Sequence, residues 1–137
     1  MDADRIFRLP VYRRFSDLDP LGHVNNVVFY DYLQEARVQM FTELGHLDVQ
    51  SLSTVVTHQE IYFRKPLVLH PEPIIIETWI SEVGRATYTV RYRILDESGD
   101  LAAEGLTALA CLNLETGRPV RINDDLRAKL LELRIES

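Results

Sequence analysis

The sequence contains little of three features that by themselves would define a class of protein: cysteine, long apolar runs and excess basic charge. Cys111 is the only cysteine among the 137 residues, so no internal disulfide can form and we expect a reducing compartment. No apolar run approaches the roughly 20 residues that span a bilayer. The first ten residues lack the apolar stretch of a secretory signal. We therefore expect a soluble, cytoplasmic protein that does not insert into membranes.

The shortage of basic charge narrows the range of partners. There are 15 Lys and Arg residues against 21 Asp and Glu residues, which gives a formal net charge of −6. Because binding to a nucleic acid backbone needs a clustered basic surface, we do not expect a nucleic acid partner. The four histidines are scattered along the chain and Cys111 stands alone, so the sequence offers no set of metal ligands.

One long helical pattern and several strand-like segments are present. Apolar residues recur at steps of three and four over residues 26–44, and Gly45 is placed to end this helix. Before it, residues 6–16 are typical of a strand, with Pro10 near its start or on a sheet edge. Val, Ile, Thr and aromatic residues between turn signals predict four further strands, over 53–63, 73–83, 86–95 and 101–114.

The arrangement of these segments predicts the fold class. Residues 123–135 form a short amphipathic helix, with Asn123 or Asp124 as its N-cap. The connections between strands are too short for crossover helices, so consecutive strands should pair antiparallel. We predict an α+β fold in which a curved antiparallel sheet of about five strands wraps around the long central helix. Residues 1–137 would form a single domain, and its open sheet edges favour self-association.

The polar segment "DLDPLGHVNN", residues 17–26, precedes the long helix. Pro20 and Gly22 force the backbone to turn, and Asn25 or Asn26 then caps the helix. The first N–H groups of a helix have no partner within it, and the helix dipole makes this end attractive to negative charge. An aspartate of the segment or a developing oxyanion could occupy that place, and from composition alone a turn and cap is the simpler interpretation.

The order of the residues adds to this interpretation. The segment "SDLDPLGHVNNVVFYDYLQEAR" resembles the signature of hotdog-fold acyl-CoA thioesterases, specifically the hydroxybenzoyl-CoA thioesterase-like family. The similarity continues through "IYFRKPL" and the strands to "TGRPVRI" near residue 120. Nine positions within 21 residues match in order and spacing: Asp17, Asp19, Gly22, His23, Val24, Asn25, Asn26, Ala36 and Arg37.

The resemblance implies an activity and roles for particular residues. Asp19 matches the catalytic carboxylate, which either attacks the thioester carbonyl or activates a water that does so. The amide near Asn26 matches the group that polarises the carbonyl oxygen. In the family the site lies at a dimer interface, so a homodimer or homotetramer is implied, with coenzyme A (CoA) as part of the substrate and no other cofactor. The substrate-binding residues implied are Gly22, His23, Asn25, Phe29 and Tyr30, with Tyr32 also in the acyl pocket.

Other charged residues have two interpretations each. Four basic residues could meet the phosphates of CoA or be solvated surface charges: Arg64, Lys65, Arg85 and Arg118. Asp31 and Glu35 lie one turn apart on the helix, where some hotdog thioesterases place their carboxylate, but here the pair is better explained as the polar face of the helix. Phe29 and Gln34 stand where relatives often carry Tyr and Glu, and "HPEP" at residues 70–73 replaces a usual Gly-Asp turn.

Three other functions stay open at this point. A non-catalytic acyl-CoA-binding protein would bind the thioester without turnover. A thioesterase for acyl carrier protein would perform the same chemistry on a protein-borne substrate. A dehydratase or hydratase would need a His/Asp or His/Glu set that the sequence does not show. The sequence does not predict acyl chain length or a choice between aromatic and aliphatic groups.

Overall fold

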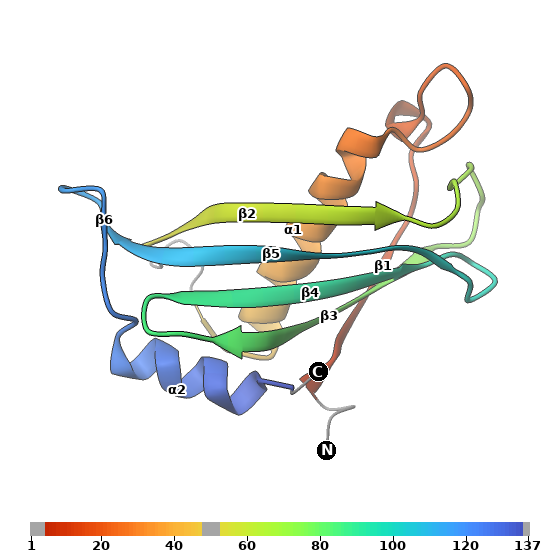
Figure 1. Cartoon of the computed structure of the whole chain (residues 1–137). Helices are drawn as coiled ribbons and strands as arrows, with labels where there is room; N and C mark the ends of the chain where they lie inside the picture. The colour runs from red at the N-terminus through yellow and green to blue at the C-terminus, as the bar shows by residue number, and fades with distance from the viewer. Residues whose placement is uncertain (1–4, 48–52, 136–137) are drawn as a thin grey trace.

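A computed structural model describes residues 5–47 and 53–135, and Figure 1 shows the arrangement of its elements. The strands form one antiparallel sheet, in which two-residue β6 (Arg118–Pro119) pairs with β5 at its end. The other five strands lie in the order β1 (Phe7–Val11), β3 (Ile74–Val83), β4 (Thr87–Leu95), β5 (Leu101–Asn113) and β2 (Thr54–Phe63).

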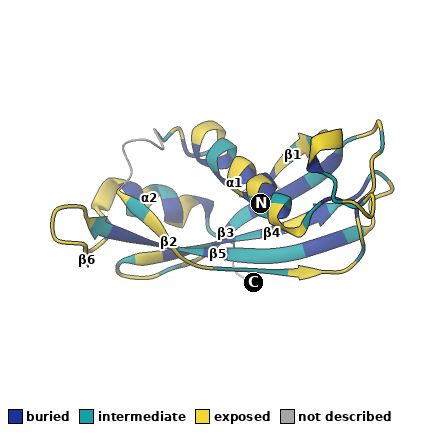
Figure 2. Ribbon diagram, turned by 90° about the horizontal axis from the view of Figure 1, so that it is seen from above, coloured by how far each residue is buried: buried dark blue, intermediate teal, exposed yellow. Residues whose placement is uncertain are grey.

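The long helix α1 (Asn26–Glu43) lies across one face of this sheet, as Figure 2 shows from above. Its apolar residues at steps of three and four face the sheet, because Phe29, Leu33, Ala36 and Met40 are all buried. On the strands, alternate residues join the same core, among them Tyr88, Tyr92 and Ile94 of β4. The predicted α+β architecture of the hotdog type is therefore confirmed.

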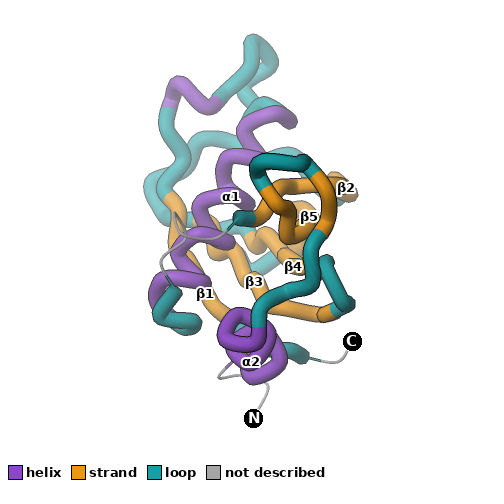
Figure 3. Tube along the Cα trace, turned by 90° about the vertical axis from the view of Figure 1, so that its left-hand side faces the viewer, coloured by secondary structure: helices purple, strands orange, loops and turns teal. Residues whose placement is uncertain are grey.

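The short helix α2 (Asp124–Leu133) closes one end of the sheet next to β3 (Figure 3). Asn123 is its N-cap, accepting a hydrogen bond from the Leu126 amide at 2.8 Å. After the helix, the Ile135 amide donates to the Ile80 carbonyl at 2.8 Å. This contact continues the pairing along the edge of β3 beyond Phe7, the first residue of β1, which lies opposite Thr78.

Two predictions about the strands need correction. The first strand is shorter than residues 6–16, because β1 ends at Val11 and a single 3₁₀ turn, η2 (Phe15–Asp17), follows. β2 does not pair with the next strand along the chain, β3, but with β5 on the far side of the sheet. The connection at residues 64–73 contains three prolines, which lack the N–H that a hairpin ladder would need.

Gly45 also has a different role from the predicted one. The last helical turn is followed by Leu44 as C-cap, and the left-handed backbone conformation falls on His46, with φ 52°. Gly45 is needed for space, because an added Cβ would lie 2.9 Å from the Phe41 carbonyl oxygen. Within the described residues, no helix is both long enough and apolar enough to cross a membrane.

Candidate active site

The loop that carries the motif is a compact turn fastened at its base. The Asn25 amide donates to the Asp17 carbonyl at 2.9 Å, and the Asp19 amide donates to the His23 carbonyl at 2.7 Å. Gly22 has a φ of +83°, which a residue with a side chain rarely adopts. The Val24 amide donates to the Leu67 carbonyl at 2.8 Å, so the loop also rests on the segment that follows β2.

Asp17 is buried and its carboxylate is fully occupied by hydrogen bonds. It is 2% exposed, and it accepts from the Tyr32 hydroxyl at 2.7 Å and the Arg14 amide at 3.0 Å. The Arg14 guanidinium adds bonds of 2.9 and 3.1 Å. Burial alone raises the pKa of the Asp17 carboxyl, but these hydrogen bonds outweigh it and hold the pKa below its usual range. Asp17 is therefore an ionised structural anchor between the loop and α1.

Asp19 is half-buried and still has a free carboxylate oxygen. Its Oδ1 accepts from the Leu21 and His23 amides at 2.9 and 3.2 Å, which fixes the plane of the carboxylate. Its Oδ2 has no hydrogen-bond partner among the residues that the structure describes. The two aspartates of the motif thus differ in their free hydrogen-bonding capacity. Among the described residues, both oxygens of Asp17 are bonded, whereas Asp19 keeps one oxygen that could accept a proton from a substrate or water.

Helix α1 begins directly after this loop. Asn25 is the N-cap, because its side-chain oxygen accepts from the Val27 amide at 2.9 Å. The Val28 amide donates to the Asn25 carbonyl at 2.9 Å. Across residues 5–47 and 53–135, the Asn26 amide finds no acceptor. A free N–H at the positive end of a helix dipole is suited to bind a carbonyl oxygen that gains negative charge.

The start of α1 faces an open hollow of about 290 Å³. Its apolar wall includes Phe29 and Phe63, whose ring centroids are 5.0 Å apart. The lining residues are Val24, Asn26, Phe29, Phe63, Arg64, Lys65 and Pro66. Asp19 is not among them, so within one chain the carboxylate lies beside the hollow and not in its wall.

Of the other expected contacts, Gly22, His23 and Asn25 belong to the same turn as Asp19. Tyr30 is half-buried on α1. Tyr32, which we expected in the acyl pocket, instead points to Asp17; burial and this hydrogen bond raise the pKa of its hydroxyl. No periodicity in the sequence distinguishes these two tyrosines, because only the tertiary position of Asp17 decides which one it binds.

Two of the four candidate phosphate-binding residues lie at the hollow. Arg64 donates to Glu104 at 3.2 Å, and its guanidinium lies 5.6 Å from the centre of the Tyr62 ring. The Lys65 ammonium contacts Asp96 at 2.6 Å and Asp100 at 3.2 Å. These hydrogen bonds raise the pKa of Lys65, so it stays charged at neutral pH. Both basic groups already have carboxylate partners within the chain.

The other two candidates lie at the opposite end of the sheet. Arg85 is exposed in the turn between β3 and β4, and Arg118 is exposed on β6. The ten residues of β2 that separate the two ends span about 33 Å. A single chain therefore does not bring the four basic residues together.

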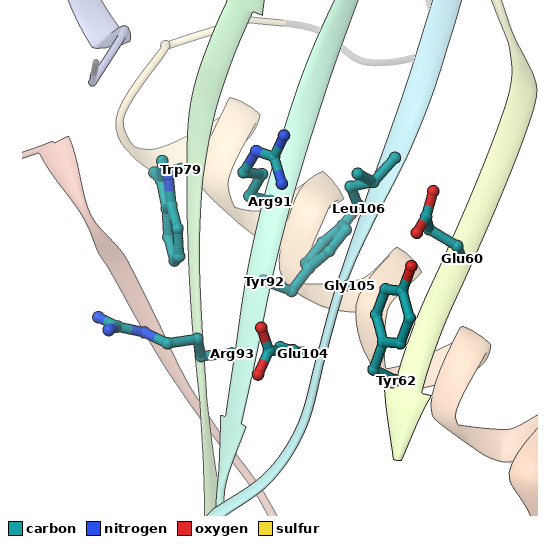
Figure 4. Close-up of a pocket in the computed structure, with 9 residues that line it drawn as sticks. All are labelled: Glu60, Tyr62, Trp79, Arg91, Tyr92, Arg93, Glu104, Gly105 and Leu106. Atoms are coloured by element: carbon teal, nitrogen blue, oxygen red, sulfur yellow. The ribbon is translucent and has the colours of Figure 1, made fainter. Parts of the chain in front are cut away.

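A second hollow, of about 370 Å³, lies on the sheet face that points away from α1. Figure 4 shows its lining side chains spread over neighbouring strands, with α1 behind the sheet. The charged groups here are already paired within the chain: Arg93 with Glu77, Arg91 with Ser81 and Glu82, Glu104 with Arg64, and Glu60 with His58. This surface leaves no free group comparable to Asp19.

Arg13, a buried residue that the sequence did not distinguish, connects the segments that surround the site. Arg13 is 6% exposed and donates to the Val68 and Glu72 carbonyls at 2.8 and 2.7 Å, and to the Glu97 carboxylate at 2.6 Å. It ties the end of β1 to the segment beneath the motif loop. In the part of the chain that the structure describes, no group of three or more His, Cys, Asp or Glu residues could hold a metal ion.

Comparison with known proteins decides the family. A family model for the thioesterase-like superfamily matches residues 13–130, which include the motif loop, α1 and the whole sheet from β2 to β6. The chain belongs to the thioesterase-like superfamily. This match confirms the resemblance to hotdog-fold thioesterases that the motif at residues 17–37 indicated.

Individual relatives are similar to this superfamily member over almost their whole length. A thioesterase from Thermus thermophilus, solved in complex with coenzyme A and Zn, is 30% identical; the match covers 94% of this chain and 93% of that one, with a TM-score of 0.82. A predicted thioesterase from Bacillus stearothermophilus is 25% identical, covers 96% and 98% of the two chains and has a TM-score of 0.85. The long-chain acyl-CoA thioesterase FadM of Escherichia coli (strain K12) is 25% identical, over 85% of this chain and 90% of FadM.

Proposed function

We propose that the protein hydrolyses acyl-CoA thioesters to the free acid and coenzyme A. One observation carries this proposal. Asp19 Oδ2 and the Asn26 amide, which have no hydrogen-bond partner among the described residues, belong to the same hydrogen-bonded motif loop, next to an open hollow. Membership of the superfamily supports thioester hydrolysis as the reaction class. The similarity to FadM and to the thioesterase solved with coenzyme A supports acyl-CoA as the substrate.

The proposed reaction uses the two groups in separate roles. The Asn26 amide donates to the thioester carbonyl oxygen and stabilises the charge that develops there. Asp19 takes a proton from a water molecule while the water oxygen adds to the carbonyl carbon. The tetrahedral intermediate then breaks the carbon–sulfur bond, and the leaving thiolate takes up the proton. In the alternative, Asp19 itself attacks the carbonyl carbon, the carbon–sulfur bond breaks and coenzyme A leaves as the thiolate. Water then hydrolyses the resulting anhydride to the free acid and regenerates the Asp19 carboxylate, and the thiolate takes up the proton released.

We also propose that a second copy of the chain completes the site through β2. This strand is an edge of the sheet, and its outer backbone groups lie open. Large apolar residues are exposed along it: Val55, Val56, Tyr62 and Phe63, with exposed fractions of 37, 43, 54 and 49%. Because Phe63 also lines the hollow beside Asn26, pairing at this edge would place the partner chain next to the substrate site.

The decisive experiment measures thiol release from a panel of acyl-CoAs, from acetyl to palmitoyl with benzoyl and phenylacetyl, for the wild type and for Asp19→Asn. We expect release by the wild type and a loss of about 10²- to 10⁴-fold in kcat for Asp19→Asn, since a general base contributes in that range. Asp31→Asn is the matched control, because Asp31 is exposed on α1 and lines neither hollow, and its rate should equal that of the wild type.

The same experiment separates the other functions. A wild-type rate in Asp19→Asn would contradict the assigned role of this carboxylate. Binding of acyl-CoA without thiol release would favour the binding protein, and release only from acyl carrier protein thioesters would favour the second alternative. An enoyl or hydroxyacyl thioester formed without free thiol would indicate a dehydratase or hydratase.

A further inference from the structure

A buried arginine without a carboxylate partner lies between α1 and the sheet. Arg37 is 8% exposed, and no carboxylate of residues 5–47 or 53–135 lies within 4.0 Å of its guanidinium. Burying a charge without a counter-ion is costly. The other deeply buried arginine, Arg13, has Glu97 at 2.6 Å. Arg37 is therefore an exception among the buried arginines, and its position calls for an acceptor that none of the described residues provides.

The groups around Arg37 form a chain of donors. The Arg37 Nη1 donates to the Tyr92 hydroxyl at 3.0 Å, and the Tyr92 hydroxyl donates to Thr107 Oγ1 at 2.9 Å. The Thr107 hydroxyl in turn donates to Gln59 Oε1 at 3.0 Å. Burial raises the pKa of Tyr92, so its hydroxyl keeps its proton. Every acceptor in this network is neutral, and none balances the positive charge.

The network ends with more donors than acceptors. The Arg37 Nε and Nη2 and the Gln59 amide nitrogen have no hydrogen-bond acceptor among the described residues. The Arg37 Nε and Nη2 are also not among the enclosed polar atoms that lack a partner, so these two nitrogens keep contact with the exterior. A guanidinium with free N–H groups and a neighbouring amide N–H form a site for a carboxylate or another strong acceptor.

This network and the proposed site lie along the same two elements. Phe29 of α1 packs on Phe63 of β2 at the hollow, while Arg37 connects to Gln59 of β2 through Thr107. From Asn26 to Arg37 the helix rises about 16 Å. From Phe63 to Gln59 the strand advances about 14 Å. At roughly 1.3 Å per carbon of an extended chain, both distances correspond to about eleven to twelve carbons.

We propose that Arg37 and Gln59 select acyl groups that carry an acceptor, a carboxylate above all, about eleven to twelve carbons from the thioester. The inference rests on the proposed thioester hydrolysis, because it requires the carbonyl at the start of α1. The acyl chain runs along the inner side of β2, past Ile61, which is half-buried. The terminal carboxylate then supplies the counter-charge for Arg37.

The test compares dodecanoyl-CoA with dodecanedioyl-CoA, which differ only in the terminal carboxylate. We expect the wild type to favour the dicarboxylate in kcat/KM by at least about tenfold, as expected for hydrogen bonds to a charged group. Arg37→Met should abolish this preference while dodecanoyl-CoA is still hydrolysed. Arg121→Met is the matched control, because Arg121 is exposed and bonds only Asp124, and the preference should stay intact.

Each outcome bears on a separate statement. Hydrolysis of dodecanoyl-CoA with no preference in the wild type would overturn the inference and leave the proposed function standing. No hydrolysis of any acyl-CoA would overturn the proposed function itself. If Arg37→Met dissociates an oligomer and leaves the preference unchanged, the guanidinium is paired across an interface and the inference is wrong. If Arg37→Met does not fold, Gln59→Leu decides, with a loss of preference supporting the inference and an unchanged preference overturning it.

Discussion

The hydrogen bond between Asp17 and Tyr32 allows a quantitative test of how the motif loop, residues 17–26, is held in place. Both side chains are buried, at 2 and 6% exposure, and their oxygens are 2.7 Å apart. A hydrogen bond to a charged group contributes about 1.5–3 kcal/mol, so Tyr32→Phe should lower the free energy of unfolding by that amount. Tyr30→Phe is the control, because the same change is made two residues away where the structure records no hydrogen bond for the hydroxyl. It should cost no more than about 0.5 kcal/mol.

A double-mutant cycle isolates the interaction from other effects of the substitutions. Urea unfolding at pH 7 would be measured for Asp17→Asn, Tyr32→Phe and the double variant. The sum of the losses in unfolding free energy of the two single variants should exceed the loss of the double variant by at least about 1 kcal/mol. Additive costs, within about 0.5 kcal/mol, would refute the assignment of Asp17 as the anchor of the loop.

The pH dependence provides an independent check. The pKa of Asp17 is lower in the folded protein than its ordinary value of 3.8, so its contribution to stability is complete above that value and is lost as the pH falls through the folded pKa. The difference between wild type and Tyr32→Phe should therefore be full at pH 7 and shrink below about pH 4. A difference that is constant from pH 7 to pH 3 would show that the carboxylate charge is not involved.

Two further predictions concern β2. Gly105→Ala should lower stability by about 1–3 kcal/mol in urea unfolding, because the added Cβ would overlap the Glu60 carbonyl oxygen and force β5 from β2. Gly84→Ala is the control, because its Cβ would come no closer than 3.1 Å to its nearest neighbour, the Thr87 hydroxyl, and it should cost less; equal costs would contradict this reason. Val56→Lys should lower the molar mass measured by sedimentation to that of one chain, since a charge on an edge strand opposes pairing. An unchanged multimeric mass would exclude β2 as the interface, and a wild type that sediments as one chain would refute the pairing itself.

The sequence predicts local structure well wherever local residues determine it. The four later strands and both helices fall within two residues of their predicted bounds, because turn residues and apolar periodicity mark them directly. Asn25 and Asn123 are the N-caps, each one of the two candidates predicted at its position, since a cap bonds only two or three residues along the chain. The order of the strands is not local, and the position of β2 beside β5 could not be derived from neighbouring residues.

The candidate site likewise has features that local residues determine and features that depend on residues distant in the sequence. The motif places a carboxylate at a helix start, but the different fates of Asp17 and Asp19 depend on Tyr32, which lies 15 residues from Asp17. Likewise Lys65 appears in the sequence as a free basic residue, while in the fold it is bound by Asp96, 31 residues away. Arg37 matched the family pattern without an assigned role, and the role proposed for it rests on its burial in the fold.

The two edge strands of the sheet differ in length and in proline content, and this difference limits how many chains can join edge to edge. β1 has five residues, and Pro10 within it has no backbone N–H to offer a neighbour. β2 has ten residues and no proline. Two chains joined through β2 would present only β1 at both outer ends, so a ribbon built in this way would terminate itself after two members. The same edge that favours a specific pair would thus be used up in forming it, which protects the protein from open-ended fibres.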